Sequence, residues 1–274
     1  MTDVRRLAES LGAELLRAWP LAGGVSAQVT ALEVRQRGQT RRLVVRAYGA
    51  RDLARCADLA RREFELLGRL TLAGVPVPQP VLHAPGLLVT SFVEGVGGLD
   101  APADPLVLAD VLAQIHAVPV TGLLSLPLSA PVPPRGMPDE RLSESRIRRA
   151  LASWAPPAGP EVLVHGDFWP GNTLWQGGRL SAVIDWEDAA LGHPLADLGN
   201  ARLEVCWAQG EAAMADLTRR YAMRTGQDLT GLPYWDLQAA LRPCDRLDTW
   251  GLEADTLERM RTLHARFVTQ AMER

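Results

Sequence analysis

The stretch VLVHGDFWPGN (residues 162–172), followed by VIDWEDA (residues 183–189), decides the fold of this chain. The first string contains a carboxylate, Asp167, and an amide five residues later, Asn172. The second contains another carboxylate, Asp185, thirteen residues after the amide. Oxygen ligands of this kind bind Mg²⁺ together with the phosphates of a substrate. Their order therefore predicts a magnesium-dependent site for phosphoryl transfer.

The residues between the two strings predict a β-hairpin. Residues 173–175 (Thr-Leu-Trp) favour a strand, and residues 180–184 alternate in a way that is typical of a second strand. Gly177 and Gly178 lie between them and suit a tight turn. The two strings are therefore expected to meet at the open end of one hairpin.

This hairpin predicts where the magnesium ligands lie. With the two glycines at its tip, Asn172 lies roughly opposite Val183, and side-chain alternation places Asp185 on the face of Val183. Diagonal neighbours of this kind have Cβ atoms about 7 Å apart, so one Mg²⁺ would bind both side chains. Asp167 lies in the preceding loop, where a base that orients an attacking hydroxyl belongs.

The two strings resemble those of a known family. An Asp and an Asn five residues apart, followed by a metal-binding Asp, match the catalytic segment of the protein-kinase fold. The forms His-Gly-Asp (residues 165–167) and Ile-Asp-Trp (residues 184–186) resemble the aminoglycoside phosphotransferase family of small-molecule kinases, related to choline, homoserine and fructosamine kinases. This resemblance implies an α+β, bilobal protein-kinase-like fold. It has a small antiparallel-sheet lobe that binds nucleotide (residues 1–92) and a larger, mostly helical lobe with the catalytic loop and acceptor site (residues 93–274).

Composition excludes several other classes of protein. The 274 residues carry a net charge of −3, so no basic surface indicates a nucleic-acid partner, and no apolar run approaches the about 20 residues that span a membrane. All 29 basic residues are arginine. Cys56, Cys206 and Cys244 are scattered without a CxxC pair, which disfavours a disulfide framework or a zinc site. With no secretory signal pattern at the start, a cytoplasmic protein is expected.

The N-terminal region predicts a helix followed by strands. The leucine spacing favours a helix over residues 2–19, and strands then run to Tyr48. Between them, Gly23, Gly24 and Ser26 form a sequence that is typical of an ordinary tight turn. The family resemblance implies that this turn covers the phosphates of the nucleotide.

Arg46 stands where the kinase fold has a phosphate-binding lysine on its third strand. It is either a counterpart of that lysine or an exposed strand arginine like Arg41 and Arg42. An apolar stripe predicts a helix over residues 52–70, and Glu63 lies at the edge of this stripe. We therefore expect Glu63 to point inward as the acidic partner of Arg46.

The segment after this helix leads toward the second lobe. GLLVTSFVEG (residues 86–95) predicts a buried strand and a connection. The resemblance implies that adenine bonds backbone groups of Ser91 and Val93, whereas the residues alone suit a core strand. A helix capped by Asp104 is expected to end at His116. Residues 118–138 are rich in proline and lack periodicity, which leaves a lid and a disordered segment both open.

The C-terminal third reads as helices, on which the resemblance places supporting and substrate-binding residues. Asp197 is implied to bond backbone groups of the catalytic loop, with His165 in a similar supporting role. The candidates for an acidic and aromatic pocket suited to a cationic amino sugar or amine are Asp188, Glu204, Trp207, Asp245 and Asp248.

The sequence thus favours an enzyme that moves the γ-phosphoryl group of ATP, with GTP as the other option, to a hydroxyl of an aminoglycoside, amino sugar or amino alcohol. Asp167 would accept the hydroxyl proton, Asn172 and Asp185 would bind Mg²⁺, and Arg46 would steady the phosphates. A non-catalytic nucleotide-binding relative is the main alternative. A protein kinase is disfavoured because an Ala-Pro-Glu string is missing, and a metal-dependent hydrolase because it would not need the hairpin spacing. The acceptor and the oligomeric state stay open.

Overall fold

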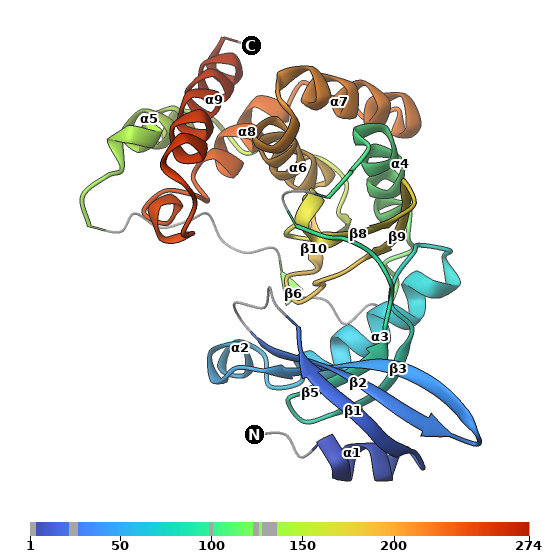
Figure 1. Ribbon diagram of the computed structural model, residues 1–274. Coiled ribbons are helices and arrows are strands. Elements are labelled where there is room, and N and C mark those ends of the chain that lie inside the picture. The colour runs from blue at the N-terminus through green and yellow to red at the C-terminus, as the bar shows by residue number, and fades with distance from the viewer. Residues whose placement is uncertain (1–3, 22–26, 99–100, 123–125, 128–135, 274) are drawn as a thin grey trace. The chain divides into compact units, whose positions relative to one another are not determined.

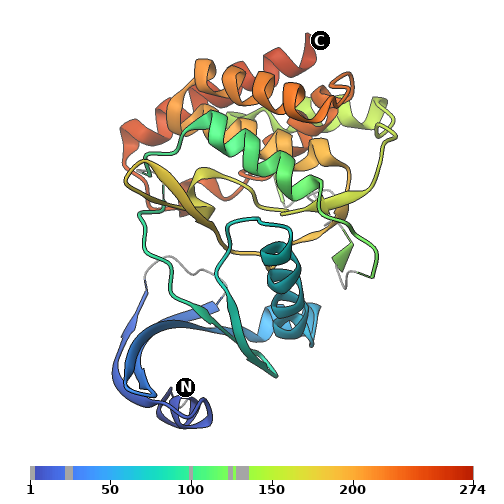
Figure 2. The same ribbon diagram turned by 90° about the vertical axis from the view of Figure 1, so that its right-hand side faces the viewer.

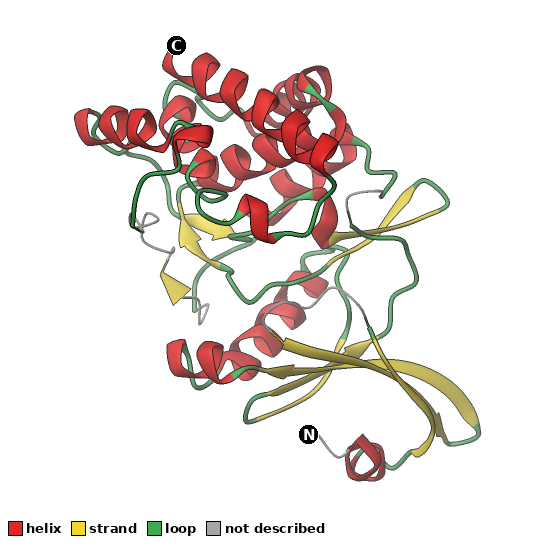
Figure 3. Cartoon of the chain, turned by 60° about the vertical axis from the view of Figure 1, so that its left-hand side comes forward, coloured by secondary structure: helices red, strands yellow, loops and turns green. Residues whose placement is uncertain are grey.

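The computed structural model describes residues 4–21, 27–98, 101–122, 126–127 and 136–273. The chain divides into two compact units, Met1–Gly95 with Ser181–Glu187, and Val96–Leu180 with Asp188–Arg274. Strands dominate the first unit and helices dominate the second (Figures 1 and 3). This confirms the predicted α+β class with one mostly helical part.

The first unit contains a five-stranded sheet in the order β1-β2-β3-β5-β4, in which every neighbouring pair is antiparallel. Helix α1 packs against β1, and helix α3 packs against β4 and β5. The bounds are α1 Val4–Ser10, β1 Glu14–Pro20, β2 Ala27–Gln36, β3 Gln39–Tyr48, α2 Ala50–Arg55, α3 Leu59–Leu72, β4 Pro80–Ala84 and β5 Leu87–Ser91.

Strand β3 places Arg46 at the centre of this sheet, where it pairs with Val29 on β2 and Leu88 on β5. Leu43 and Val45 point to the opposite face and are buried in the core beneath the sheet. Alternation along the strand therefore puts Arg46 on the face away from that core.

The start of the chain differs from the expected helix over residues 2–19. Helix α1 ends at Ser10, and β1 pairs with β2 along its length, with Ala18 opposite Leu32. The leucine spacing suited a helix, but the neighbouring strand offers partners for the backbone groups of residues 14–20, and this pairing overrides the local pattern. The predicted nucleotide turn, Gly23, Gly24 and Ser26, lies outside the described residues.

The helix expected over residues 52–70 is also interrupted. It consists of α2 and α3, which are separated at Cys56. Glu63 lies on α3 and is 5% exposed, so it points inward as the stripe predicted.

The second unit packs its helices around α6, which contacts α4, α7, α8 and α9 (Figure 2). Asp104 caps α4 by accepting a hydrogen bond from the Leu106 amide, as its sequence position predicted. None of the described helices is long and apolar enough to cross a membrane. The bounds are α4 Pro105–His116, β6 Leu126–Pro127, η1 Glu140–Leu142, α5 Glu144–Ser153, β7 Val162–Val164, η2 Pro170–Asn172, β8 Thr173–Gln176, β9 Arg179–Val183, β10 Ala190–Gly192, α6 Pro194–Gln209, α7 Glu211–Thr225, α8 Leu232–Ala240, η3 Leu247–Thr249 and α9 Ala254–Met272.

The predicted hairpin is confirmed. Strands β8 and β9 form a two-stranded sheet, and the glycines between them both have positive φ, 57° at Gly177 and 76° at Gly178. This is the conformation that a two-residue hairpin turn requires.

Asp185 does not continue the strand alternation of this hairpin, as had been expected. Strand β9 ends at Val183, and Asp185 has a φ of 67°, so strand alternation does not extend to it. Asn172 ends the short helix η2 and belongs to the second unit, whereas Asp185 belongs to the first.

The contact between α6 and α8 depends on a glycine. A Cβ atom on Gly199 would lie 2.7 Å from the carbonyl oxygen of Trp235, whereas one on Gly68 of α3 would have no atom within 4 Å. We expect Gly199→Ala to lower the free energy of unfolding by roughly 1–3 kcal/mol because the two backbones must separate. Gly68→Ala, the matched control, should raise it by about 0.5–1 kcal/mol. Urea denaturation measures both, and a Gly199→Ala variant as stable as the wild type would contradict the close approach.

Candidate active site

Helix α6 holds the loop that was predicted to be catalytic through a buried carboxylate. Asp197 accepts hydrogen bonds from the amides of His165, at 2.6 Å, and Gly166, at 2.8 Å. Its Oδ2 atom also lies 3.3 Å from His116 Nε2. Burial opposes ionisation of Asp197, but these contacts lower its pKa. A charged group inside the unit therefore fixes the two residues that precede Asp167.

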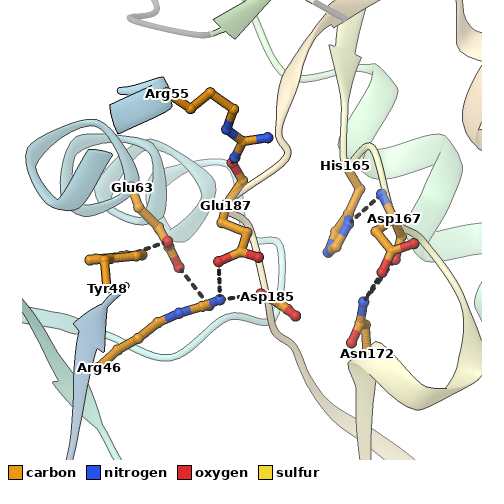
Figure 4. A network of polar contacts seen from close by, with 9 residues as sticks. All are labelled: Arg46, Tyr48, Arg55, Glu63, His165, Asp167, Asn172, Asp185 and Glu187. Atoms are coloured by element: carbon orange, nitrogen blue, oxygen red, sulfur yellow. Dashed lines mark hydrogen bonds and ion pairs between the residues drawn. The ribbon is translucent and has the colours of Figure 1, made fainter. Parts of the chain in front are cut away.

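Two further contacts hold the same loop. Asn200, one turn along α6 from Asp197, donates its side-chain amide to the carbonyl of Phe168 at 3.2 Å. The buried imidazole of His165 accepts the Asp167 amide at Nδ1, 3.3 Å away (Figure 4). His165 and Asp197 therefore contact backbone groups of the loop that was predicted to be catalytic.

Asn172 contacts Asp167 across the loop. Its Nδ2 atom donates to the Asp167 carbonyl at 2.8 Å and to the carboxylate Oδ2 at 3.1 Å (Figure 4). Because the nitrogen makes both bonds, the amide oxygen is the atom of Asn172 that would bind a metal. The carboxylate is one-third exposed, which allows a substrate to approach it.

Arg42 and Arg46 lie on one strand but differ in surroundings. Arg42 is half-exposed and pairs with Glu94, whereas Arg46 is only 14% exposed. Arg46 Nη2 lies 2.5 Å from both Asp185 and Glu187, and its Nη1 lies 3.6 Å from Glu63 (Figure 4). Arg46 is therefore no exposed strand arginine.

Three carboxylates surround this one guanidinium. Burial opposes its charge, but Glu63, Asp185 and Glu187 raise the pKa of Arg46 above its usual value. The hydroxyl of Tyr48 donates to Glu63 at 2.5 Å and lies on the same face of β3. The three carboxylates therefore hold the charged guanidinium in place.

The two side chains predicted to bind the metal each offer an oxygen of the kind that Mg²⁺ prefers. Asp185 supplies a carboxylate that is 37% exposed, and Asn172 supplies an amide oxygen. Mg²⁺ is commonly held by one or two protein groups, with waters and phosphates as its other ligands. Among the described residues no three His, Cys, Asp or Glu side chains gather as a metal site. A site completed by nucleotide phosphates would not need such a group.

The backbone of Ser91, predicted to bond adenine, is partly engaged. Its amide donates to the Gln79 carbonyl at 2.8 Å, and its hydroxyl accepts from the Gln79 amide at 2.9 Å. The Ser91 amide therefore already has a partner within the sheet. Val93 follows the end of β5.

One of the five residues predicted for an acidic and aromatic pocket lies in the core. Trp207 is 1% exposed in the core of the second unit and donates to the Met260 carbonyl, so its ring cannot line an open site. Trp207 lies on the face of α6 that packs against neighbouring helices, and the sequence alone did not show which face that is. Asp248 forms ion pairs with Arg141 and Arg261. Asp245 is exposed, and its backbone has a φ of 60°.

Two of the five acceptor candidates lie near the catalytic loop. The Asp188 carbonyl is so close to Gly166 that an added Cβ would lie 2.3 Å from it. Glu204 on α6 is half-buried, and burial together with the charge of Asp167 raises its pKa to about 8. Glu204 is therefore largely protonated at neutral pH.

Sequence reasoning missed three residues of these clusters. Arg242, just after α8, donates to Asp167 and to the Gly166 carbonyl, and Glu187 pairs with Arg46. His193 caps α6 by accepting the Leu195 amide at 3.1 Å. Glu187 lies within the quoted VIDWEDA string, and Pro194 marks the start of α6, so local signals existed for two of them. No local signal points to Arg242.

A family model described as the phosphotransferase enzyme family matches residues 18–237. The chain belongs to this family. The resemblance to the aminoglycoside phosphotransferases is thereby confirmed at the level of this enzyme family.

Curated relatives match parts of this phosphotransferase. Acyl-CoA dehydrogenase family member 11 of Rattus norvegicus is 27% identical over 240 residues, which cover 66% of this chain and 29% of that protein. Hygromycin-B 4-O-kinase of Escherichia coli is 39% identical over 85 residues, which cover 30% of this chain and 24% of that enzyme. The chain thus spans less than a third of either relative's length.

Solved structures share the fold of this phosphotransferase over nearly its whole length. The apoenzyme of macrolide 2′-phosphotransferase MphH from Brachybacterium faecium has a TM-score of 0.65 at 21% identity, covering 96% of this chain and 98% of that one. A thermostable mutant of aminoglycoside phosphotransferase APH(4)-Ia, in a ternary complex with ADP and hygromycin B, has a TM-score of 0.63 at 21% identity and covers 98% of both chains. These likenesses confirm the kinase-like fold.

The raised pKa of Glu204 predicts how the stability of the folded protein depends on pH. Its pKa in the folded protein, about 8, is above the ordinary value of 4.5, so folding favours the protonated form. The stability that this residue contributes is therefore fully present below about pH 4.5 and is lost as the pH rises through about 8. We expect Glu204→Gln to melt at a higher temperature than the wild type at pH 8, by about 2–4 °C per kcal/mol recovered. The difference should shrink at pH 5. Thermal unfolding at both values measures it, with the exposed Glu211 changed to Gln as the control; equal melting temperatures at pH 8 would contradict the assignment.

Proposed function

We propose that this phosphotransferase moves the γ-phosphoryl group of ATP, with Mg²⁺, to a hydroxyl group of a small molecule. The observation that supports it most is the fixed pair of Asp167 and Asn172, with Asp197 bonding the two amides before Asp167. An orienting carboxylate next to a magnesium-binding amide is the arrangement that phosphoryl transfer requires. The nucleotide site is assigned to residues 1–92, and the acceptor site to residues 93–274.

In this proposal Asp167 orients the acceptor hydroxyl and takes its proton. Asn172 and Asp185 would hold Mg²⁺, which supplies positive charge against the phosphates. Most of the rate acceleration then comes from positioning and from charge stabilisation, because the loose transition state asks little covalent chemistry of the protein.

Arg46 would steady the phosphates, with Glu63 and Glu187 holding its guanidinium. In the structure it bonds Asp185 as well, so binding of phosphates and Mg²⁺ would exchange that contact for contacts with the nucleotide. Arginine suits this role because its planar fork bonds phosphate oxygens in pairs while still contacting a carboxylate. The turn at Gly23, Gly24 and Ser26 is assigned to the phosphates, and Ser91 and Val93 to adenine. Because the Ser91 amide already donates to the Gln79 carbonyl, the Val93 amide is the stronger candidate for the hydrogen bond to adenine.

The acceptor is proposed to be a hydroxylated molecule of the amino-sugar or amino-alcohol type. Support comes from the name of the Escherichia coli relative, hygromycin-B 4-O-kinase, and from the hygromycin B bound to a protein of similar fold. Asp188 and Glu204 are the acidic groups near Asp167 that would meet such a molecule.

One experiment tests the whole proposal. ATP and GTP are titrated by thermal shift with and without Mg²⁺, because a ligand that binds only the folded state raises the melting temperature. Release of ADP is then measured with hygromycin B, other aminoglycosides, choline, homoserine and sugar amines. Nucleotide binding without ADP release from any acceptor would instead support a non-catalytic relative, and absence of nucleotide binding would refute both.

Asp167→Asn tests the base. Turnover should fall by about 10²–10⁴-fold because the hydroxyl loses its proton acceptor, while nucleotide affinity should change less than about twofold. Steady-state kinetics and the thermal-shift titration measure the two quantities. Asp216→Asn, a change at an exposed acid of α7 paired with Arg219, is the control. A matching loss of nucleotide affinity would overturn the assigned role.

Asp185→Ala tests the metal. The variant should bind ATP equally well with Mg²⁺ and with EDTA, because the carboxylate that holds the ion is missing. The wild type should bind ATP more tightly with Mg²⁺. If the variant keeps the wild-type magnesium effect in the thermal-shift titration, Asp185 is no magnesium ligand.

A further inference from the structure

Arg242 bonds two neighbouring residues of the catalytic loop. Its Nη1 atom donates to the Gly166 carbonyl at 2.8 Å, and its Nη2 atom donates to Asp167 Oδ1 at 2.6 Å. Two nitrogens of one planar group thus contact a backbone oxygen and a carboxylate oxygen of consecutive residues. A lysine, with a single nitrogen, could not reproduce this geometry.

The sequence of the loop supplies no positive charge of its own. Phe168, Trp169, Pro170 and Gly171 separate Asp167 from Asn172, and none of them is a cation. Asp167 forms an ion pair with Arg242. The charge opposite this carboxylate therefore comes from a residue 75 positions further along the chain.

Both oxygens of the Asp167 carboxylate are bonded. Arg242 holds Oδ1, and Asn172 holds Oδ2 at 3.1 Å. Two donors on different oxygens set the rotation of the carboxylate about its last bond. Each carboxylate oxygen has two acceptor sites, so an acceptor hydroxyl can still bond to it.

The anionic state of Asp167 has a cost in phosphoryl transfer. The carboxylate must lie close to a phosphoryl group that is itself negative, and like charges at a few ångströms repel strongly where water is partly excluded. A guanidinium bonded directly to the carboxylate offsets this repulsion without filling the acceptor's approach, since 34% of the Asp167 side chain stays exposed.

We propose that Arg242 is a positioning residue for phosphoryl transfer, which sets the orientation of the Asp167 carboxylate and offsets its charge beside the phosphates. This inference rests on the proposed function. The competing explanation is that Arg242 only ties the end of α8 to the loop and contributes to stability alone.

Steady-state kinetics of Arg242→Ala separate the two explanations. The probe is ADP release from ATP and Mg²⁺ with the acceptor that the panel selects, or with water as acceptor if none accelerates the reaction. We expect kcat to fall by about 10²-fold, the typical cost of a displaced catalytic group, with the KM for ATP within about twofold of the wild type. Guanidinium ion at tens of millimolar should restore part of kcat, because it can occupy the vacated position.

Two variants serve as controls. Arg242→Lys keeps the charge but not the fork, so its kcat should be intermediate, about tenfold below the wild type, and it should not respond to guanidinium. This variant also keeps the test valid if Arg242→Ala fails to fold. Arg219→Ala removes an arginine of α7 that is 67% exposed and should match the wild type with and without guanidinium.

The outcomes are distinct. A folded Arg242→Ala variant with kcat within twofold of the wild type, or with a loss that guanidinium does not restore, overturns the positioning role while the proposed function stands. An Arg242→Lys variant with wild-type kcat overturns it as well. A wild-type protein that releases no ADP with any acceptor or with water refutes the proposed function, and this inference with it.

Discussion

The buried carboxylate of Asp197 is the constraint on which the site depends. It is 2% exposed and bonds the amides of two consecutive loop residues, so a shift of the loop would remove two hydrogen bonds from a buried charge. Losing hydrogen bonds to a buried charge is costly, which strongly favours this loop conformation. The start of α6, where Asp197 lies in the first turn, adds a favourable dipole. His193 fixes that helix start through its cap. Helix α6 therefore holds the backbone before Asp167, while Arg242 and Asn172 hold its carboxylate.

The same principle organises the charged groups of each unit. In the first unit, Glu63, Asp185 and Glu187 hold one guanidinium; in the second, Asp167 is held by Arg242 and Asn172. Each functional charge already has opposite charges or dipoles around it before any ligand binds. In the proposed role of Asp167, contacts that are already made would reduce the reorganisation during the reaction, which is a main source of electrostatic catalysis. Arg46 differs, because the proposed function exchanges its contact with Asp185 for contacts with the nucleotide.

The sequence predicted what depends on local pattern or on spacing within one segment. The hairpin at Gly177 and Gly178, the cap at Asp104 and the inward direction of Glu63 all follow from residues close together in the chain. Features that depend on distant partners were missed. Strand β1 exists because β2 lies beside it, and Arg242 contacts Asp167 only because α8 packs against α6. The face of α6 that carries Trp207 could not be chosen without knowing that α6 is surrounded by helices.

The charge state of Glu204 bears on which acceptors the site suits. The acidic residues in the sequence predicted an anionic pocket. Two neighbouring carboxylates, Glu204 and Asp167, do not both ionise readily, because each negative charge disfavours the other. With a pKa of about 8, Glu204 contributes little negative charge at neutral pH until a cation approaches. An ammonium group on the acceptor would lower that pKa, ionise Glu204 and release a proton on binding, whereas an uncharged acceptor would leave the proton in place. The affinity for an amine-bearing acceptor would then rise with pH up to about 8, because less work is needed to remove the proton from Glu204.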